Sequence, residues 1–100
     1  MVLAFLKRWF ARTPQQRPDL HFLLYTRAAC PLCNEASEIL TRYQQRYGFA
    51  LESKNVDDAE ELVRQHGNCV PVVVVNGKVR FRGHVNEVLL QRILDGKPSD

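Results

Sequence analysis

The sequence has few of the features that mark specialised small proteins. Its 100 residues include three cysteines, an odd number that is too small for a disulfide-stapled scaffold and that indicates a reduced, cytoplasmic setting with one working pair. No internal repeat or low-complexity tract occurs. Hydrophobic residues make up 45% of the chain and charged residues 25%, as in ordinary globular proteins. We therefore expect a monomer with one hydrophobic core.

Most of the chain also lacks an excess of charge of one sign. The net charge is +3, and the first eighteen residues hold four basic side chains, Lys7, Arg8, Arg12 and Arg17, and no acidic one. Of the 14 basic residues, ten remain from residue 19 onward, against eleven acidic ones. A domain that is nearly neutral offers no basic surface, so we expect no binding to nucleic acid.

Residues 1–19 are predicted to form an N-terminal extension and linker, and residues 20–100 the domain. Apolar residues within 1–12 recur at helical spacing beside basic ones, which predicts a short amphipathic helix. Lys7 and Arg8 break its apolar run, and its charges follow the apolar residues, so neither a transmembrane helix nor a secretory signal is expected. Three uses stay open: packing on the domain, weak contact with a membrane surface, or organellar targeting.

The main motif follows an apolar stretch. Residues 22–26, Phe-Leu-Leu-Tyr-Thr, contain no breaker and predict a strand buried on both faces. Pro31 then suits the first position of a helix, which places Cys30 at the N-cap. Unpaired backbone N–H groups and the helix dipole favour the thiolate there. Cys30 is therefore the predicted nucleophile, and Cys33, one turn later and deeper, the predicted resolving thiol of a Cys-Pro-Leu-Cys redox motif.

Other uses of the cysteines stay open at this point. His66 and Cys69 repeat the two-residue spacing, so Cys30, Cys33, His66 and Cys69 could form a Cys3His zinc set. Alternatively, Cys30 and Cys33 could be core residues at helical spacing, although Pro31 argues for a helix start. We interpret Cys69 as a small buried filler, with a third reactive thiol as the alternative. No metal is expected under the redox interpretation.

The pattern after Cys33 predicts two helices separated by a strand. The apolar face of the first helix consists of Ala36, Ile39, Leu40, Tyr43 and Tyr47. Gly48 ends this helix, and a strand over 49–56 with one wetter face follows, as expected at the edge of a sheet. Asp57-Asp58-Ala59-Glu60 predicts a capping box that opens a short helix ending at Gly67. Asp57 and Glu60 are therefore expected to have structural roles.

The last third of the chain predicts a hairpin and a helix. Strands over 71–75 and 78–82 flank Asn76-Gly77, which predicts a type I′ turn. The apolar face of the last helix is expected to consist of Val85, Val88, Leu89, Ile93 and Leu94. Gly96 and Pro98 close it.

The order β-α-β-α-β-β-α predicts an α/β fold with a four-stranded mixed sheet flanked by helices on both faces. We expect the first and third strands to lie side by side and parallel in the middle of the sheet. Pro71 at the start of a central strand would lose a hydrogen bond of the sheet and needs a positional reason. A cis Val70-Pro71 bond would supply one, since it would bring residues 69–71 close to the two sulfurs.

This set of motifs resembles the glutaredoxin-like branch of the thioredoxin-fold superfamily over residues 20–96. The resemblance implies that Cys30 attacks, that Cys33 resolves, and that the backbone of Val70 before Pro71 orients the substrate. It also implies glutathione as a co-substrate, with Arg27 pairing a glutathione carboxylate. The substrate-binding positions that it marks are Arg27, Pro31, Leu32, Val70, Pro71, Gly83 and His84.

The chain departs from the glutaredoxin pattern at several of these positions. Leu32 stands where Tyr is common, and His84 replaces the second glycine of a Gly-Gly pair and would crowd the approach to glutathione. Asn86 replaces an aspartate and carries no charge. We expect a thiol-disulfide oxidoreductase acting on protein or glutathione mixed disulfides. The alternative is a module that binds zinc or an iron-sulfur cluster, or that docks a partner.

Overall fold

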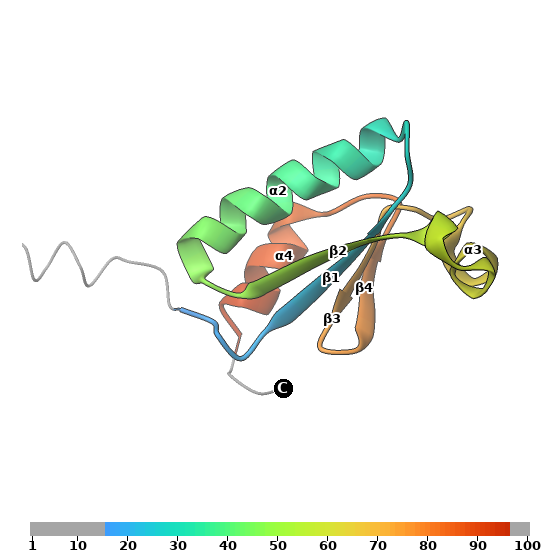
Figure 1. Ribbon diagram of the computed structural model, residues 1–100. Helices are drawn as coiled ribbons and strands as arrows, with labels where there is room; N and C mark the ends of the chain where they lie inside the picture. Colours follow the sequence, from blue (N-terminus) through green and yellow to red (C-terminus); the bar gives the residue numbers. More distant parts are fainter. Residues whose placement is uncertain (1–15, 97–100) are drawn as a thin grey trace, which may run out of the picture.

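The computed structural model describes residues 16–96, so the predicted helix over residues 1–12 and Pro98 lie outside the described residues. The elements are β1 (His21–Thr26), α2 (Pro31–Tyr47), β2 (Ala50–Asn55), the 3-10 turn η1 (Val56–Asp58), α3 (Glu60–His66), β3 (Val72–Val75), β4 (Lys78–Arg82) and α4 (Glu87–Leu94), as drawn in Figure 1. The predicted β-α-β-α-β-β-α order is confirmed. Over this range no helix is long and apolar enough to cross a membrane.

The four strands form one mixed sheet in the order β2-β1-β3-β4, so β1 and β3 are central, as predicted. The predicted direction of β3 is wrong, because β3 runs antiparallel to β1, while β1 and β2 are parallel. The reason lies in the connections. The 17 residues of α2 return the chain to the start of the sheet. The seven residues of α3 span only about 10 Å, so β3 begins at the edge where β2 ends and runs back.

The hydrophobic core lies between one face of the sheet and the two longer helices, α2 and α4 (Figure 1). Phe22 and Leu24 point into it from β1 and are almost completely buried. The predicted apolar face of α2 is confirmed, since all five of its residues are buried. The opposite face of β1 is only half-buried, contrary to the prediction, because α3 contacts it at one end, where His66 stacks on Tyr25 with ring centroids 4.7 Å apart.

Two tyrosines of α2 tie this helix to α4. The Tyr43 hydroxyl donates a hydrogen bond to Glu87 at 3.0 Å, and the Tyr47 hydroxyl donates one to Asp95 at 3.1 Å. Burial, together with these carboxylates, raises the pKa of both hydroxyls, so both remain protonated donors at neutral pH. The helix ends as predicted at Gly48, whose φ of 69° is in the left-handed region that glycine adopts without strain.

The predicted apolar face of α4 is wrong in part. Val88 is 64% exposed and Leu89 is 45% exposed, whereas Leu90 and Leu94 are fully buried. The helix begins at Asn86, whose side-chain oxygen accepts hydrogen bonds from the Val88 and Leu89 N–H groups. Val85 and Leu94 are buried and Ile93 is half-buried, as predicted, but Leu90 takes the buried position that the spacing assigned to Val88 and Leu89.

Arg17 is a buried charged side chain that joins the two ends of the described chain. It falls in the predicted linker, yet it is only 2% exposed. Its guanidinium forms a two-point pair with Asp19 and donates to the carbonyl oxygens of Ile93, Leu94 and Gly96 at 2.7 to 3.1 Å. These carbonyls lie at the C-terminal end of α4, where a positive charge is stabilising.

Substitution of Arg17 by Ala is expected to destabilise the domain by about 2 to 4 kcal/mol, since it removes the donor of three hydrogen bonds to carbonyl oxygens at the end of α4, one of them buried. Urea denaturation of the full chain would measure this loss. Arg80→Ala, at an exposed arginine on β4, is the matched control and should change stability by less than about 0.5 kcal/mol. Equal losses in the two variants would contradict the structural role assigned to Arg17.

Candidate active site

The two cysteines of the Cys-Pro-Leu-Cys motif lie together at the start of α2 and are joined as a disulfide, with their Cα atoms 5.2 Å apart. Cys30 is the N-cap, as predicted, and its sulfur accepts a hydrogen bond from the Cys33 N–H at 3.2 Å. Pro31 occupies the first turn of the helix. Cys30 is half-buried and Cys33 is 2% exposed, so a disulfide approaching from solvent meets Cys30 first.

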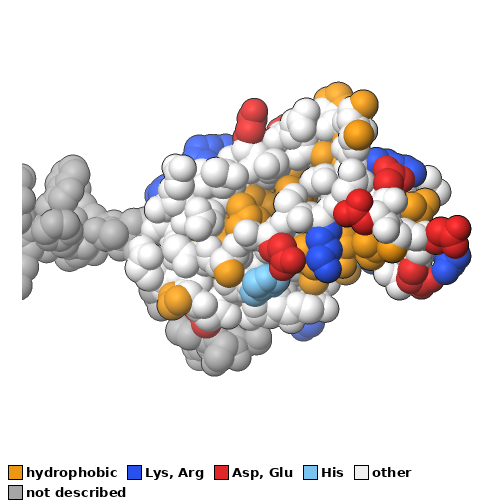
Figure 2. Space-filling view, in the orientation of Figure 1, with side chains coloured by type: hydrophobic (Ala, Val, Ile, Leu, Met, Phe, Trp, Pro, Cys, Tyr) orange, Lys and Arg blue, Asp and Glu red, His pale blue; other side chains and the backbone are white. Residues whose placement is uncertain are grey.

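The residues around Cys30 form an apolar rim, which we define as Ala28, Ala29, Pro31 and Leu32, all exposed. Leu32 is the large hydrophobic residue of this rim and is 49% exposed. Figure 2 shows hydrophobic side chains gathered over the start of α2, at the upper right. Ala29 has a φ of 54°, which is uncommon for a residue with a Cβ atom, and the turn that it forms directs the chain into the N-cap. No residue type or spacing around Ala29 predicts this backbone conformation.

The predicted cis peptide bond between Val70 and Pro71 is present. Pro71 is buried and Val70 is half-buried. The Pro71 carbonyl oxygen accepts a hydrogen bond from the Gly83 N–H at 2.7 Å, which brings two of the predicted substrate-binding positions together. Gly83 has a φ of 75°, a conformation that favours glycine, and His84 beside it is exposed.

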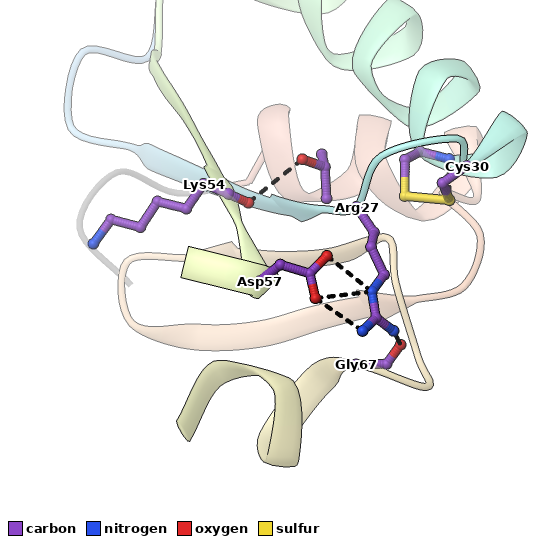
Figure 3. The surroundings of a disulfide bond; sticks show 7 residues. Arg27, Cys30, Lys54, Asp57 and Gly67 are labelled. Carbon is purple, nitrogen blue, oxygen red and sulfur yellow. Dashed lines mark hydrogen bonds and ion pairs between the residues drawn. A yellow bond between two sulfur atoms is a disulfide. The ribbon is translucent and has the colours of Figure 1, made fainter. Parts of the chain in front are cut away.

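Arg27 lies three residues before Cys30 but points away from the disulfide, as Figure 3 shows. Its Nε and Nη2 atoms donate to the carboxylate of Asp57 at 2.9 to 3.2 Å, and its Nη1 atom donates to the Gly67 carbonyl oxygen at 3.0 Å. The hydrogen bonds from Arg27 hold the pKa of Asp57 below its usual value, and Asp57 raises the pKa of Arg27. Both groups therefore stay charged at neutral pH.

The predicted capping box at Asp57 is wrong. The side chain of Asn55 accepts a hydrogen bond from the Asp57 N–H at 2.9 Å and opens the 3-10 turn η1 instead. The helix α3 begins after Ala59, which supplies no side-chain cap. Asp57 lies two residues before the N-cap position of α3, and its carboxylate is bound to Arg27, 30 residues earlier in the chain. A contact between residues so far apart in the chain cannot be predicted from the spacing of residue types along the sequence.

Cys69 is exposed, so its interpretation as a buried filler is wrong. Its N–H donates to the His66 carbonyl oxygen at 2.9 Å. The His66 ring is half-buried against Tyr25, and its Nδ1 atom is buried without a hydrogen-bond partner in the described structure. Among residues 16–96 no three His, Cys, Asp or Glu side chains are grouped to hold a metal ion, so the Cys3His set is not brought together.

The fold and the site define the class of this protein: a thioredoxin-like fold that carries a Cys-x-x-Cys pair able to form a disulfide. Residues 21–95 match the Glutaredoxin-like domain (DUF836), and the chain belongs to this family. A curated relative named Probable Thioredoxin, from Methanothermobacter thermautotrophicus, is 29% identical over 63 residues, which cover 60% of this chain and 74% of that protein.

Two solved structures share this fold. Protein Ne2328 of Nitrosomonas europaea superposes with a TM-score of 0.68 and 27% identity, over 79% of this chain and 94% of that one. The glutaredoxin grx-1 of Archaeoglobus fulgidus superposes with a TM-score of 0.54 and 24% identity, over 88% of this chain and 94% of that one. The second likeness shows the fold alone.

Alkylation of the native, oxidised protein is expected to modify one cysteine, Cys69, because it is the exposed free thiol while Cys30 and Cys33 are joined. Intact mass spectrometry after treatment with iodoacetamide would show one adduct, and reduction under denaturing conditions would raise the number to three. Cys69→Ser should take up none before reduction. An adduct on Cys30 or Cys33 before reduction would contradict the disulfide.

Proposed function

We propose that this chain is a thiol-disulfide oxidoreductase in which Cys30 is the nucleophile and Cys33 the resolving thiol. The observation that carries this proposal is the position of Cys30 as the half-buried N-cap of α2, bonded to a cysteine that solvent does not reach. Once the pair is reduced, the backbone N–H groups at this helix end stabilise Cys30 as a thiolate, which is the reactive form. Cys33 is buried and cannot be reached by a substrate disulfide, so we assign it the role of the resolving thiol.

The proposed reaction has two exchange steps. The Cys30 thiolate attacks one sulfur of a substrate disulfide, a bond forms between the two sulfurs, and the other half of the substrate leaves as a thiolate. The Cys33 thiolate then attacks the Cys30 sulfur, the Cys30–Cys33 disulfide forms, and the second half leaves as a thiolate. Two electrons pass to the substrate, and an external thiol or dithiol must return two electrons to the protein.

The other positions of the site are proposed to bind the substrate. The apolar rim would contact side chains beside the substrate disulfide, with Leu32 as its most prominent member. Val70 would offer its backbone groups to the extended substrate segment, held in place by the buried Pro71. Gly83 lies directly beside Pro71, and the exposed His84 borders the same surface.

The proposed substrates are protein disulfides and mixed disulfides with glutathione, and glutathione is the proposed electron donor. The glutaredoxin-like family and the relative named Probable Thioredoxin support these two substrate classes. A reducing compartment such as the cytoplasm would supply the donor, since its glutathione pool keeps dithiols of this kind largely reduced. The chain would act as a monomer, because the proposed cycle uses only one Cys30–Cys33 pair.

Exchange of either cysteine for serine separates the two roles. Cys30→Ser is expected to abolish the reduction of a disulfide substrate, because no thiolate is left at the helix N-terminus. Cys33→Ser is expected to stop after the first step and accumulate a mixed disulfide on Cys30. Insulin reduction with dithiothreitol would measure turnover, and peptide mapping under non-reducing conditions would locate the trapped bond.

Cys69→Ser is the matched control for these two variants and should keep the wild-type rate, since Cys69 has no part in the proposed cycle. Circular dichroism of all three variants would confirm that the fold is intact. Unchanged turnover in a folded Cys30→Ser would refute the proposal. Trapping on Cys69 in place of Cys30 would show that the roles of the thiols are assigned wrongly.

A further inference from the structure

The guanidinium of Arg27 is held by acceptors from two other parts of the chain. Asp57, in η1, accepts from its Nε and Nη2 atoms, and the Gly67 carbonyl oxygen after α3 accepts from its Nη1 atom. Figure 3 shows that these contacts turn the guanidinium away from Cys30. The cation nearest to the motif in the sequence is therefore already bound by a carboxylate of the protein.

A carboxylate on a substrate would have to compete with Asp57 for Arg27. Asp57 belongs to the same chain, so its effective concentration at the guanidinium is on the order of millimolar or higher. Its negative charge also repels a second carboxylate. Because Arg27 is 37% exposed and Asp57 is 46% exposed, water screens the pair. The competition therefore lowers the preference for substrates that bear a carboxylate but does not exclude them.

The exposed residues directly beside Cys30 have the opposite character. The apolar rim carries no charged side chain, so its side chains offer no ion pair to a carboxylate. Such a surface favours substrate segments with apolar residues next to the disulfide. The pairing of Arg27 with Asp57 and the apolar side chains of the rim thus both disfavour a small disulfide with free carboxylates.

From this arrangement we propose that Asp57 is a specificity-determining residue: by holding Arg27, it disfavours disulfides that bear carboxylates, such as glutathione disulfide, relative to disulfides that lack them. This inference rests on the proposed function, because it requires Cys30 to attack the substrate. The chemistry is unchanged: the two exchange steps oxidise the Cys30–Cys33 dithiol and reduce the small disulfide to two thiols.

Two disulfides that differ only in their carboxylates test the proposal: glutathione disulfide and its tetraethyl ester. The reduced full chain is mixed with each, quenched with acid, alkylated, and analysed by intact mass to give the rate of oxidation of the Cys30–Cys33 pair. The quantity compared is the rate with glutathione disulfide divided by the rate with the ester. Asp57→Asn is expected to raise this ratio about fivefold, the upper range for an exposed ion pair.

Three further variants control the result. Asp57→Glu keeps the carboxylate and should keep the wild-type ratio. Glu61→Gln removes the same charge from an exposed pair with Arg64 on α3 and should leave the ratio unchanged. Arg27→Gln combined with Asp57→Asn should lose the gain, because the released cation is then missing. The ratio is taken within each variant, so a general loss of activity cancels.

An unchanged ratio in Asp57→Asn would overturn the proposal. An equal rise in Glu61→Gln, or in the double variant, would also overturn it, because the effect would then be one of overall charge and not of Arg27. The rate at which the tetraethyl ester oxidises the wild-type chain tests the proposed function separately. If the ester does not oxidise the Cys30–Cys33 pair of the wild-type chain, the oxidoreductase assignment itself fails.

Discussion

The start of α2 is the point on which the site depends. The Cys33 N–H donates to the Cys30 sulfur at 3.2 Å, and this contact exists only because β1 ends, the chain turns at Ala29, and Pro31 begins the helix. Burial of the apolar face of α2 against the sheet fixes the direction of the helix and keeps Cys33 out of water. The same packing leaves Cys30 at the surface, so the core of the domain sets the different accessibility of the two sulfurs.

A second segment of the chain begins at the same edge of the sheet as the motif. The short α3 leaves β3 to start beside the carboxyl ends of β1 and β2, with the cis Val70-Pro71 bond at the turn. Arg27 connects this region with the motif, because it bonds both Asp57 before α3 and Gly67 after it. One arginine therefore joins three segments around the proposed substrate surface, and its charge is neutralised in the process.

Local chemistry made much of this structure predictable from sequence. Pro31 placed Cys30 at a helix start, and Pro71 before a β-branched run marked the cis bond, because in both cases the residue has few conformations to choose from. Contacts between distant residues were not predictable. Asp57 fits the sequence pattern of a capping box, but its carboxylate binds Arg27. Arg17 lies in a segment whose composition predicts a linker, but its guanidinium binds the carbonyl oxygens at the end of α4. The direction of β3 follows from the short α3, which the sequence does predict, but the predicted parallel pairing rests on a crossover rule that applies to parallel strands only.

Everything proposed for this site requires that Cys30 and Cys33 form a reversible dithiol couple at the N-terminus of α2. The decisive experiment is a redox titration of the purified full chain in glutathione buffers, read by intact mass with bound metal measured in parallel. We expect one transition between the dithiol and the Cys30–Cys33 disulfide, a two-electron change. No transition across the accessible potentials, together with tightly bound zinc, would contradict the claim and favour a metal site at the cysteines.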